Sequence, residues 1–289
     1  MHSEPLGILS LFSILILTTG MAFGPEKPLA TALRVMSYNV RYDNPADGPN
    51  SWQHRKERVA HLIHSHQPDL LGLQEVLHNQ LTYLEEELAD YSRIGVGRKD
   101  GKQAGEFSPI FYDRKKLEVL DSGTFWLSTT PLQPSIGWDA SLERIATWAV
   151  FRYRRSGDTV AFFNTHFDHR GTQAREESAR LLLEKVEAHA AQYPVVVTGD
   201  FNSNPQSIPY QLLTQDHTLR DALTISEVPH VGPHQSFSGF EATSSLPGDR
   251  IDYVFVSSQV QVVRHSIDAS SNDQYFPSDH LPVIAEVKW

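Results

Sequence analysis

Eight short runs of apolar residues, rich in Val, Ile, Phe and Tyr, restrict the fold of this chain more than any other feature. Such residue types favour strands. The runs occupy residues 33–40, 69–76, 108–113, 146–153, 159–167, 194–201, 252–257 and 281–287. Segments such as LLGL and VVV within them are apolar on both faces, which is typical of strands covered on both sides of a sheet.

Two longer segments between these runs have the spacing of helices. In residues 55–66 and 173–191, apolar residues recur at intervals of three and four, and a proline follows each segment as a stop signal. No low-complexity linker or internal repeat divides the chain. We therefore predict one α/β domain over residues 31–289.

The composition narrows the chemistry that is available to the protein. The absence of cysteine removes thiol nucleophiles, thiolate metal sites and disulfides. With 35 acidic and 25 basic residues the formal net charge is -10, which argues against a protein that coats nucleic acid through a basic face. Hydrophobic residues make up 40% of the chain, which is enough apolar material for a sizeable core.

The N-terminal residues 6–24 carry no charge and begin with the apolar stretch LGILSLFSILIL. An apolar stretch followed by small residues resembles a secretory signal peptide, and we expect residues 1–24 to direct export to the periplasm or the extracellular space. The same uncharged stretch is long enough to span a membrane. A membrane-tethered protein, anchored by residues 6–24, is therefore the alternative.

Several of the predicted strands end in a carboxylate, an amide or an imidazole. The residues are Asn39, Glu75, His166, Asp200, Asn202 and the tail segment Ser278-Asp279-His280. Taken alone, Asn39 is compatible with a turn, Glu75 with a helix start and Asp200 with an Asx-turn. Because ligands of α/β folds gather at strand ends, the recurrence of the pattern predicts a site. Carboxylates and an amide without thiolates suit a hard cation such as Mg²⁺ or Mn²⁺.

Six blocks extend this pattern along the chain: MSYNV, LQEV, NTHFD, GDFN, DRIDYVFVS and SDHLPV. In this order they resemble the endonuclease/exonuclease/phosphatase (DNase I-like) superfamily of metal-dependent phosphoesterases. The resemblance implies a four-layer α/β sandwich, with two mostly antiparallel sheets packed face to face and helices outside. Segments such as RYDNPADGPNSWQHRKERV further resemble an uncharacterised bacterial secreted group near the nocturnin and deadenylase branch, and that likeness brings no substrate with it.

The same resemblance implies a metal site. Glu75 resembles the principal Mg²⁺ ligand of the superfamily, with Asn39 beside it and Asp279 completing the set. The expected cofactor is Mg²⁺, or Mn²⁺ in its place.

The resemblance also implies catalytic roles. Asp200 resembles the carboxylate that orients or deprotonates the attacking water, and Asn202 resembles a donor to the phosphate. His166 resembles the histidine that stabilises charge developing on the phosphoryl oxygens. His280 would contact the phosphate, held by Asp252 in a carboxylate–imidazole pair that fixes its tautomer. The implied chemistry is in-line attack of water on phosphorus.

Three arginines are candidates for a further substrate contact, since guanidinium binds phosphate in a bidentate manner. They are Arg144, Arg170 and Arg175. A structural salt bridge or a solvated face is the alternative for each.

We therefore expect an exported, Mg²⁺- or Mn²⁺-dependent hydrolase of phosphate esters. A phosphorylated small molecule, nucleotide, sugar phosphate or lipid headgroup fits better than duplex DNA, because the net charge of -10 offers little attraction to a phosphate backbone. The alternatives are a nuclease acting on DNA or RNA and, more remotely, a non-catalytic module that binds a phosphorylated ligand. We expect a monomer and no protein partner.

Overall fold

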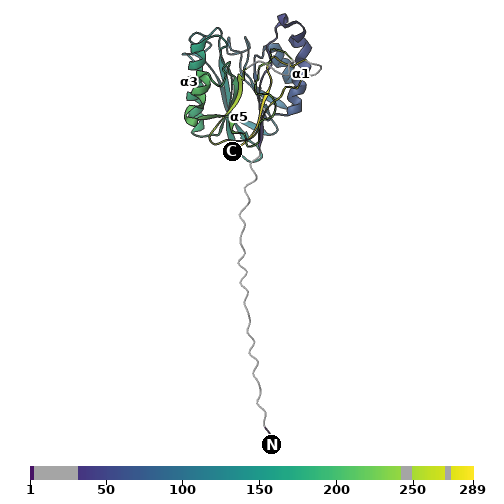
Figure 1. Ribbon diagram of the computed structural model, residues 1–289, viewed down its shortest axis with the longest axis vertical. Coiled ribbons are helices and arrows are strands. Elements are labelled where there is room, and N and C mark those ends of the chain that lie inside the picture. The colour runs from purple at the N-terminus through teal and green to yellow at the C-terminus, as the bar shows by residue number, and fades with distance from the viewer. Residues whose placement is uncertain (3–31, 242–248, 271–274) are drawn as a thin grey trace.

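Two six-stranded sheets lie face to face and helices cover their outer surfaces, so the molecule has four layers (Figure 1). The structure, a computed structural model, describes residues 1–2, 32–241, 249–270 and 275–289. In each sheet one central pair of strands is parallel and the other pairs are antiparallel. This arrangement confirms the predicted four-layer α/β sandwich with mostly antiparallel sheets.

The first sheet has the strand order β11–β12–β1–β2–β4–β3. Its strands are β1 (Leu33–Asn39), β2 (Leu70–Gln74), β3 (Tyr91–Ile94), β4 (Ile110–Asp113), β11 (Gln261–Ile267) and β12 (Val283–Lys288). The helical segments that follow β1 and β2 in the chain are η1 (Pro45–Asn50), α1 (Trp52–His66) and α2 (His78–Glu87).

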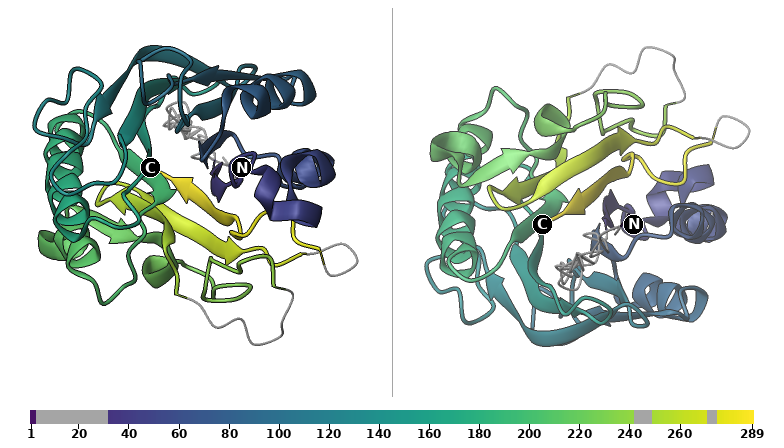
Figure 2. Two further views of the ribbon diagram at one scale, coloured as in Figure 1. Left: turned by 90° about the horizontal axis from the view of Figure 1, so that it is seen from above. Right: turned by 90° about the horizontal axis from the view of Figure 1, so that it is seen from below.

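The second sheet has the strand order β5–β6–β7–β8–β10–β9. Its strands are β5 (Leu117–Trp126), β6 (Ile145–Tyr153), β7 (Thr159–His166), β8 (Val195–Asp200), β9 (Leu219–Asp221) and β10 (Asp252–Ser257). Its helical segments are α3 (Thr172–Ala190), α4 (Ile208–Thr214), η2 (Gln215–His217) and α5 (Ala222–Ile225). Figure 2 shows α3 and α1 on opposite sides of the sandwich.

All eight predicted strands are present, and the predicted helices correspond to α1 and α3. The sequence did not predict β3, β5, β9 and β11. The predicted leader lies outside the described residues, apart from residues 1–2. Within the described ranges, none of the helices combines the length and the apolar character needed to cross a bilayer.

The predicted apolar runs meet in the middle of the sandwich. Val35 and Leu70 of the first sheet belong to one buried cluster with Phe162, Val196 and Val254 of the second. On the outer faces, a second cluster joins α1 to the first sheet and a third joins α3 and α4 to the second sheet. Strands buried on both sides are therefore apolar on both faces, as the LLGL and VVV segments indicate.

Buried hydrogen bonds connect the two sheets near one end of the sandwich. Asn164 Nδ2 donates to the Leu73 carbonyl at 2.7 Å, and Gln74 Nε2 donates to Asn164 Oδ1 at 2.7 Å. Gly72 permits this approach, because a side chain there would clash with Thr198 and Asn164. These buried hydrogen bonds favour one alignment of the two sheets, although Gln74 Oε1 has no partner among the described residues.

One buried histidine gives the fold a dependence on pH. His265 of β11 is fully buried, and its Nδ1 lies 2.9 Å from His230 Nδ1. Burial lowers the pKa of His265 to about 3, and the neighbouring His230, Arg250 and His234 add to the effect. The folded protein therefore keeps this imidazole neutral at pH values where the unfolded chain would take up a proton.

Because the unfolded state binds the extra proton below pH 6.5, the free energy of unfolding should fall as the pH is lowered through that value. Between pH 7 and pH 5 the His265 contribution is about 2 kcal/mol. Urea denaturation at the two pH values should show a smaller difference for His265→Gln than for the wild type. The exposed His61→Gln serves as the control and should behave like the wild type. Equal pH dependence in His265→Gln and the wild type would contradict the prediction.

Candidate active site

Three polar residues stand side by side at one end of the second sheet because their strands are in register. Asp200 is the last residue of β8, and its register partners are His166 of β7 and Asp252 of β10. Register partners in neighbouring strands project from the same face of a sheet. All three side chains are buried, so the sheet presents a histidine and two carboxylates in one row.

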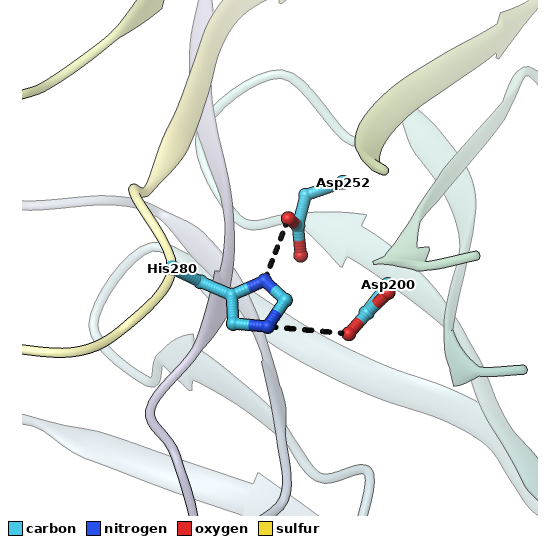
Figure 3. A group of neighbouring side chains, drawn as sticks. All are labelled: Asp200, Asp252 and His280. Atoms are coloured by element: carbon cyan, nitrogen blue, oxygen red, sulfur yellow. Dashed lines mark hydrogen bonds and ion pairs between the residues drawn. The ribbon is translucent and has the colours of Figure 1, made fainter. Parts of the chain in front are cut away.

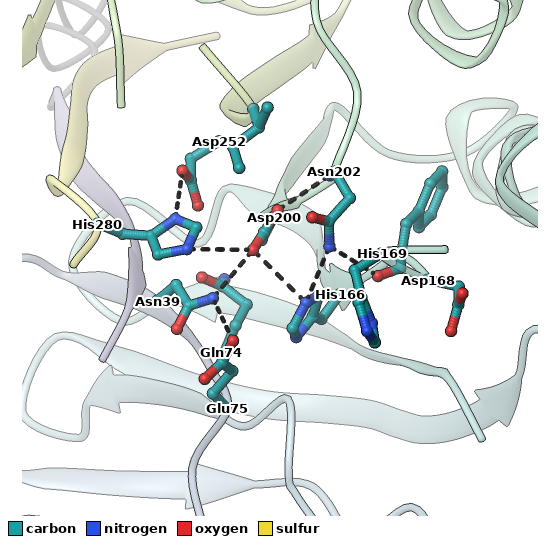
Figure 4. A network of polar contacts seen from close by, with 12 residues as sticks. Asn39, Gln74, Glu75, His166, Asp168, His169, Asp200, Asn202, Asp252 and His280 are labelled. Atoms are coloured by element: carbon teal, nitrogen blue, oxygen red, sulfur yellow. Dashed lines mark hydrogen bonds and ion pairs between the residues drawn. The ribbon is translucent and has the colours of Figure 1, made fainter. Parts of the chain in front are cut away.

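The first sheet brings two more side chains to the same place. Asn39 ends β1, and Glu75 directly follows β2. Asn39 Nδ2 donates to Asp200 Oδ2 at 2.9 Å and to Glu75 Oε1 at 3.2 Å (Figure 4). The amide of Asn39 therefore joins the two sheets at the candidate site.

His280, which precedes β12, lies between two carboxylates (Figure 3). Its Nδ1 is 2.8 Å from Asp252 Oδ2, and its Nε2 is 3.7 Å from Asp200 Oδ2. Burial works against the charged imidazole, but Asp252 and Asp200 outweigh it and raise the pKa of His280 well above 6.5. The predicted contact between Asp252 and His280 is therefore present, with a positively charged ring.

Asp200 has the properties of a proton acceptor near neutral pH. Burial raises the pKa of Asp200 to about 7, and Asp252 adds to the effect. The His280 cation opposes it, as do hydrogen bonds from the Asn202 N–H, which donates to Oδ1 at 2.9 Å, and from Asn39. A carboxyl group whose pKa lies near the working pH is well suited to general base catalysis.

His166 differs from His280 because its surroundings favour the neutral ring. Burial lowers the pKa of His166 well below 6.5, and the guanidinium groups of Arg144 and Arg98 add to the effect. Its Nε2 lies 3.5 Å from Asp200 Oδ2 and 3.1 Å from Asn202 Nδ2, and when it accepts from this amide the ring proton is on Nδ1. Among the described residues, nothing accepts a hydrogen bond from that nitrogen.

Three residues around the site adopt the left-handed backbone conformation, with φ of 56° at Arg41, 64° at Glu75 and 46° at Asn202. Such conformations cost on the order of 1–3 kcal/mol each and persist where the surroundings hold them. Glu75 is held through Oε2, which accepts from the Tyr42 N–H at 3.0 Å. The backbone at Glu75 and Asn202 is therefore held in an unfavourable conformation that sets the direction of the carboxylate and the amide.

The loop after β1 is held by a buried arginine of α1 that the sequence did not single out. The guanidinium of Arg55 donates to the carbonyl of Val40, to that of Arg41 at 2.5 Å and to that of Tyr42 at 3.3 Å. It also donates to the carbonyl of Pro277 at 3.2 Å, three residues before His280. On the sequence, a charged residue of an amphipathic helix is expected to be exposed, so no local signal marked this one.

A cavity of about 660 Å³ opens onto these side chains. The predicted residues that line it are Glu75, Arg144, His166, Arg170, Asp200, Asn202, Asp279 and His280. Asn39 and Asp252 do not line it and instead support Asp200 and His280 from behind. Arg175 lines a smaller cavity next to it. The structure thus brings all the predicted site residues together, with Arg175 at the margin.

Asp168 organises the rim of the cavity. It accepts hydrogen bonds from Ser141 Oγ at 2.9 Å and from the backbone N–H groups of Arg170 and Gly171 at 2.9 and 2.8 Å. Burial alone would raise its pKa, but these N–H groups and Arg144, at 3.4 Å, hold the pKa of Asp168 well below its ordinary value. Arg144 is therefore both a buried ion-pair partner and part of the cavity wall. The sequence contained Asp168 in the NTHFD block without marking its role.

Two further cavity residues come from loops and were not predicted. Glu106 is held by Arg98 through two contacts of 2.7 Å. Phe237 is 38% exposed, and its ring centre lies 5.1 Å from that of His280 in an edge-on arrangement. Neither residue follows a predicted strand, so the strand-end pattern could not find them.

The side chains facing the cavity include an oxygen-rich set that fits a divalent cation. Burial raises the pKa of Asp279, with His280 opposing the shift and the Glu75 carboxylate adding to it. Two carboxylates that repel each other in one cavity would be relieved by a cation between them. Asn39 Oδ1 accepts from the Arg41 N–H at 2.9 Å, so direct coordination by Asn39 stays a prediction.

A second cluster of possible ligand atoms comes from Asp200, Asp252 and His280, which lie within 4.8 Å of one another. In this cluster the imidazole already pairs with both carboxylates and carries a positive charge. A charged ring repels a cation and offers no lone pair to it. Glu75 and Asp279 therefore remain the candidate cation ligands, with Arg41 Nε 3.8 Å from Asp279 Oδ2 as a neighbouring positive charge.

The fold and this site define a class of α/β sandwich proteins whose polar centre is assembled at the matching ends of two packed sheets. Residues 36–280 match the model of the Endonuclease/Exonuclease/phosphatase family. The chain belongs to this family, and the predicted superfamily is confirmed.

Solved structures agree with this membership. A crystal structure of the endonuclease/exonuclease/phosphatase from Bacteroides vulgatus is 42% identical, with a TM-score of 0.84, and the match covers 89% of this chain and 99% of that one. The mannosyl-6-phosphatase of Bacteroides thetaiotaomicron is 37% identical, with a TM-score of 0.82, over 89% of this chain and 100% of that one.

A curated relative is the 3'-5'-exoribonuclease subunit Ccr4 of the CCR4-Not complex of Emericella nidulans. It is 23% identical, and the match covers 94% of this chain and 53% of that protein. The chain spans only about half the length of such curated relatives, from 42% to 59% for three of them.

Metal binding can be tested without an activity assay. Mn²⁺ at about 100 times its Kd should stabilise the protein by roughly 2.7 kcal/mol relative to EDTA, which corresponds to a rise in Tm of about 5–10 °C. Glu75→Gln should lose most of this rise, because it removes a carboxylate from the proposed cation site. Glu85→Gln, exposed on α2, should keep it. A Glu75→Gln protein that Mn²⁺ stabilises as much as the wild type would show that the cation binds elsewhere.

Proposed function

We propose that the protein is a divalent-metal-dependent phosphoesterase that hydrolyses small phosphate esters. The observation that carries the proposal is the convergence of two sheets on one cavity, with the charged His280, the neutral His166 and a carboxyl group, Asp200, whose pKa is raised to about 7. The family match supports phosphate-ester hydrolysis as the class of reaction.

In the proposed reaction Asp200 takes a proton from water as the water oxygen attacks phosphorus, and the bond from phosphorus to the alcohol oxygen breaks with its electron pair on that oxygen. Asn202 Nδ2 donates to His166 Nε2 and to the Phe167 carbonyl at 3.0 Å, so its proposed donation to the phosphoryl group takes the place of one of these hydrogen bonds. His280, kept charged by Asp252, stabilises the negative charge that grows on the phosphoryl oxygens. When bound by Glu75 and Asp279, a divalent cation supplies Lewis acidity to the same oxygens.

The proposed substrates are small organophosphates, sugar phosphates or lipid headgroups. The similarity to a mannosyl-6-phosphatase over almost the full length of both chains supports this preference. The net charge of -10 also disfavours duplex DNA.

A nuclease is the second candidate, and the similarity to an exoribonuclease subunit favours it. Plasmid nicking or RNA degradation that weakens steeply with salt would support the nuclease, because contacts with a phosphate backbone release counterions. Tight binding of a phosphate ester without turnover would instead support a non-catalytic module.

The central test is hydrolysis of p-nitrophenyl phosphate and bis-p-nitrophenyl phosphate with and without Mg²⁺ or Mn²⁺. We expect metal-dependent release of p-nitrophenol from at least one of them. Asp200→Asn should lower kcat by roughly 100-fold or more, since general base catalysis contributes about 10²–10⁴-fold. Asp121→Asn, an exposed substitution of the same kind, should retain wild-type activity. Unchanged kcat in Asp200→Asn would remove this residue from the mechanism.

We also propose that residues 1–24 direct export and are removed, as the apolar stretch at 6–24 suggests. Mass spectrometry of protein expressed from the full-length chain should find a mature N-terminus near residue 23. An intact N-terminus in the membrane fraction would favour the anchor instead.

A further inference from the structure

A second cavity, of about 310 Å³, lies beside the catalytic cavity and shares Asn202 and Ile251 with it. The first turns of α3 contribute Arg175 and Glu176, and the loop after β8 contributes Ser203 and Asn204. Asn202 is also a neighbour of His166 and Asp200 in the catalytic row (Figure 4). A group bound in the second cavity would therefore adjoin a phosphoryl group that is bound at Asn202.

The charge of this cavity does not suit a second phosphate. One guanidinium, that of Arg175, and two carboxylates, those of Glu176 and Asp249, line it. The Arg175 guanidinium already donates to the carbonyl of Asp168 at 3.0 Å. An anion placed here would meet a net negative wall, whereas an uncharged ligand would not.

The cavity instead contains both hydrogen-bond donors and hydrogen-bond acceptors. Asn204 Nδ2 donates to Asp249 Oδ2 at 2.9 Å, and the carboxylate of Glu176 has no hydrogen bond or ion pair with any described residue. Ser203 is only 5% exposed, and its Oγ likewise has no partner within the described ranges. Hydroxyl groups, which donate and accept, are the ligand groups that match carboxylates, an amide and a guanidinium together.

The shape and the remaining lining limit the ligand further. A volume of about 310 Å³ is at the lower end of the roughly 300–1,000 Å³ that is usual for small-molecule pockets, so one ring-sized group fits. Ile208, Pro209 and Ile251 offer an apolar surface to the C–H face of such a ring. No aromatic side chain of the described residues lines the cavity, which disfavours a stacked nucleobase.

We propose that this second cavity is the subsite for an uncharged, polyhydroxylated leaving group, so that the preferred substrates are sugar or polyol phosphates. The inference rests on the proposed function, because it takes the phosphoryl group to bind at Asn202. In the complex, substrate hydroxyls donate to Glu176 and Asp249 and accept from Arg175 and Asn204. Glu176, Arg175 and Asn204 are half-buried and Asp249 is exposed, so a ligand that lacks the hydroxyls forgoes hydrogen bonds with these groups and binds more weakly.

The test compares hexose 6-phosphates with cyclohexylmethyl phosphate, which has a similar ring and ester but lacks the hydroxyls, in the presence of Mg²⁺ or Mn²⁺. The wild type should hydrolyse the best of a glucose, mannose and galactose 6-phosphate panel with a kcat/KM at least about tenfold higher than that for the cyclohexyl ester. The Glu176→Ala variant should lower this ratio about tenfold, because it removes a charged hydrogen-bond acceptor. The matched control is Glu184→Ala, an exposed substitution further along α3, which should leave the ratio at the wild-type value. Asp249→Ala removes the second carboxylate of the subsite, which comes from a separate segment, and should also lower the ratio.

Each outcome bears on one of the two proposals. Equal kcat/KM for the two kinds of ester, or a ratio that neither variant lowers, overturns the subsite and leaves the phosphoesterase standing. If the protein hydrolyses p-nitrophenyl phosphate but none of the hexose phosphates, the subsite is likewise overturned and the phosphoesterase stands. If no ester at all is hydrolysed, the proposed function fails. Binding of the free hexoses by NMR then decides the subsite: weaker binding in Glu176→Ala than in Glu184→Ala supports it, and equal binding overturns it.

Discussion

The contact on which this structure depends is the hydrogen bond between Asn39 and Asp200, one residue from each sheet, at 2.9 Å. Neither sheet carries a complete site, because Glu75 comes from the first and His166 from the second. The site forms only if the ends of β1 and β8 meet in one alignment. Asn164 and Gln74 fix that alignment between the sheets, and a buried polar pair of this kind loses its partners if the sheets slide.

Burial and neighbouring charges then shift the pKa values of the side chains in the site. The pKa values of the two histidines shift in opposite directions: burial and, after it, Arg144 and Arg98 lower that of His166, whereas Asp252 and Asp200 outweigh burial and raise that of His280. The same burial raises the pKa of Asp200 to about 7, which is the property that the proposed general base requires. The strained backbone at Glu75 and Asn202 is sustained by hydrogen bonds within the candidate site.

The position of a strand in its sheet explains whether the sequence predicted it. The eight predicted strands are the inner strands of the two sheets, whereas the four missed strands, β3, β5, β9 and β11, are the four sheet edges. Inner strands are covered on both faces and have long apolar runs. An edge strand such as β5 carries exposed polar residues and a bulge, which interrupt the signal on which the prediction depended. Asn39, His166 and Asp200 were predictable as site residues because they end inner strands, whereas Asp252 and His280 were assigned through the family resemblance. Arg55 and Glu106 were not, because their roles come from contacts with distant loops.

The sequence by itself determined the inner strands, the order of the polar strand ends and the absence of thiol chemistry, because these follow from residue type and spacing. The family resemblance added the sheet arrangement, which periodicity alone cannot supply. Only the tertiary structure decided which histidine is charged, which carboxylates face the cavity and that a second cavity adjoins Asn202. These properties depend on burial and on distances between residues far apart in the chain. Charge states in particular follow from desolvation and from neighbouring charges, and the local sequence determines neither of these.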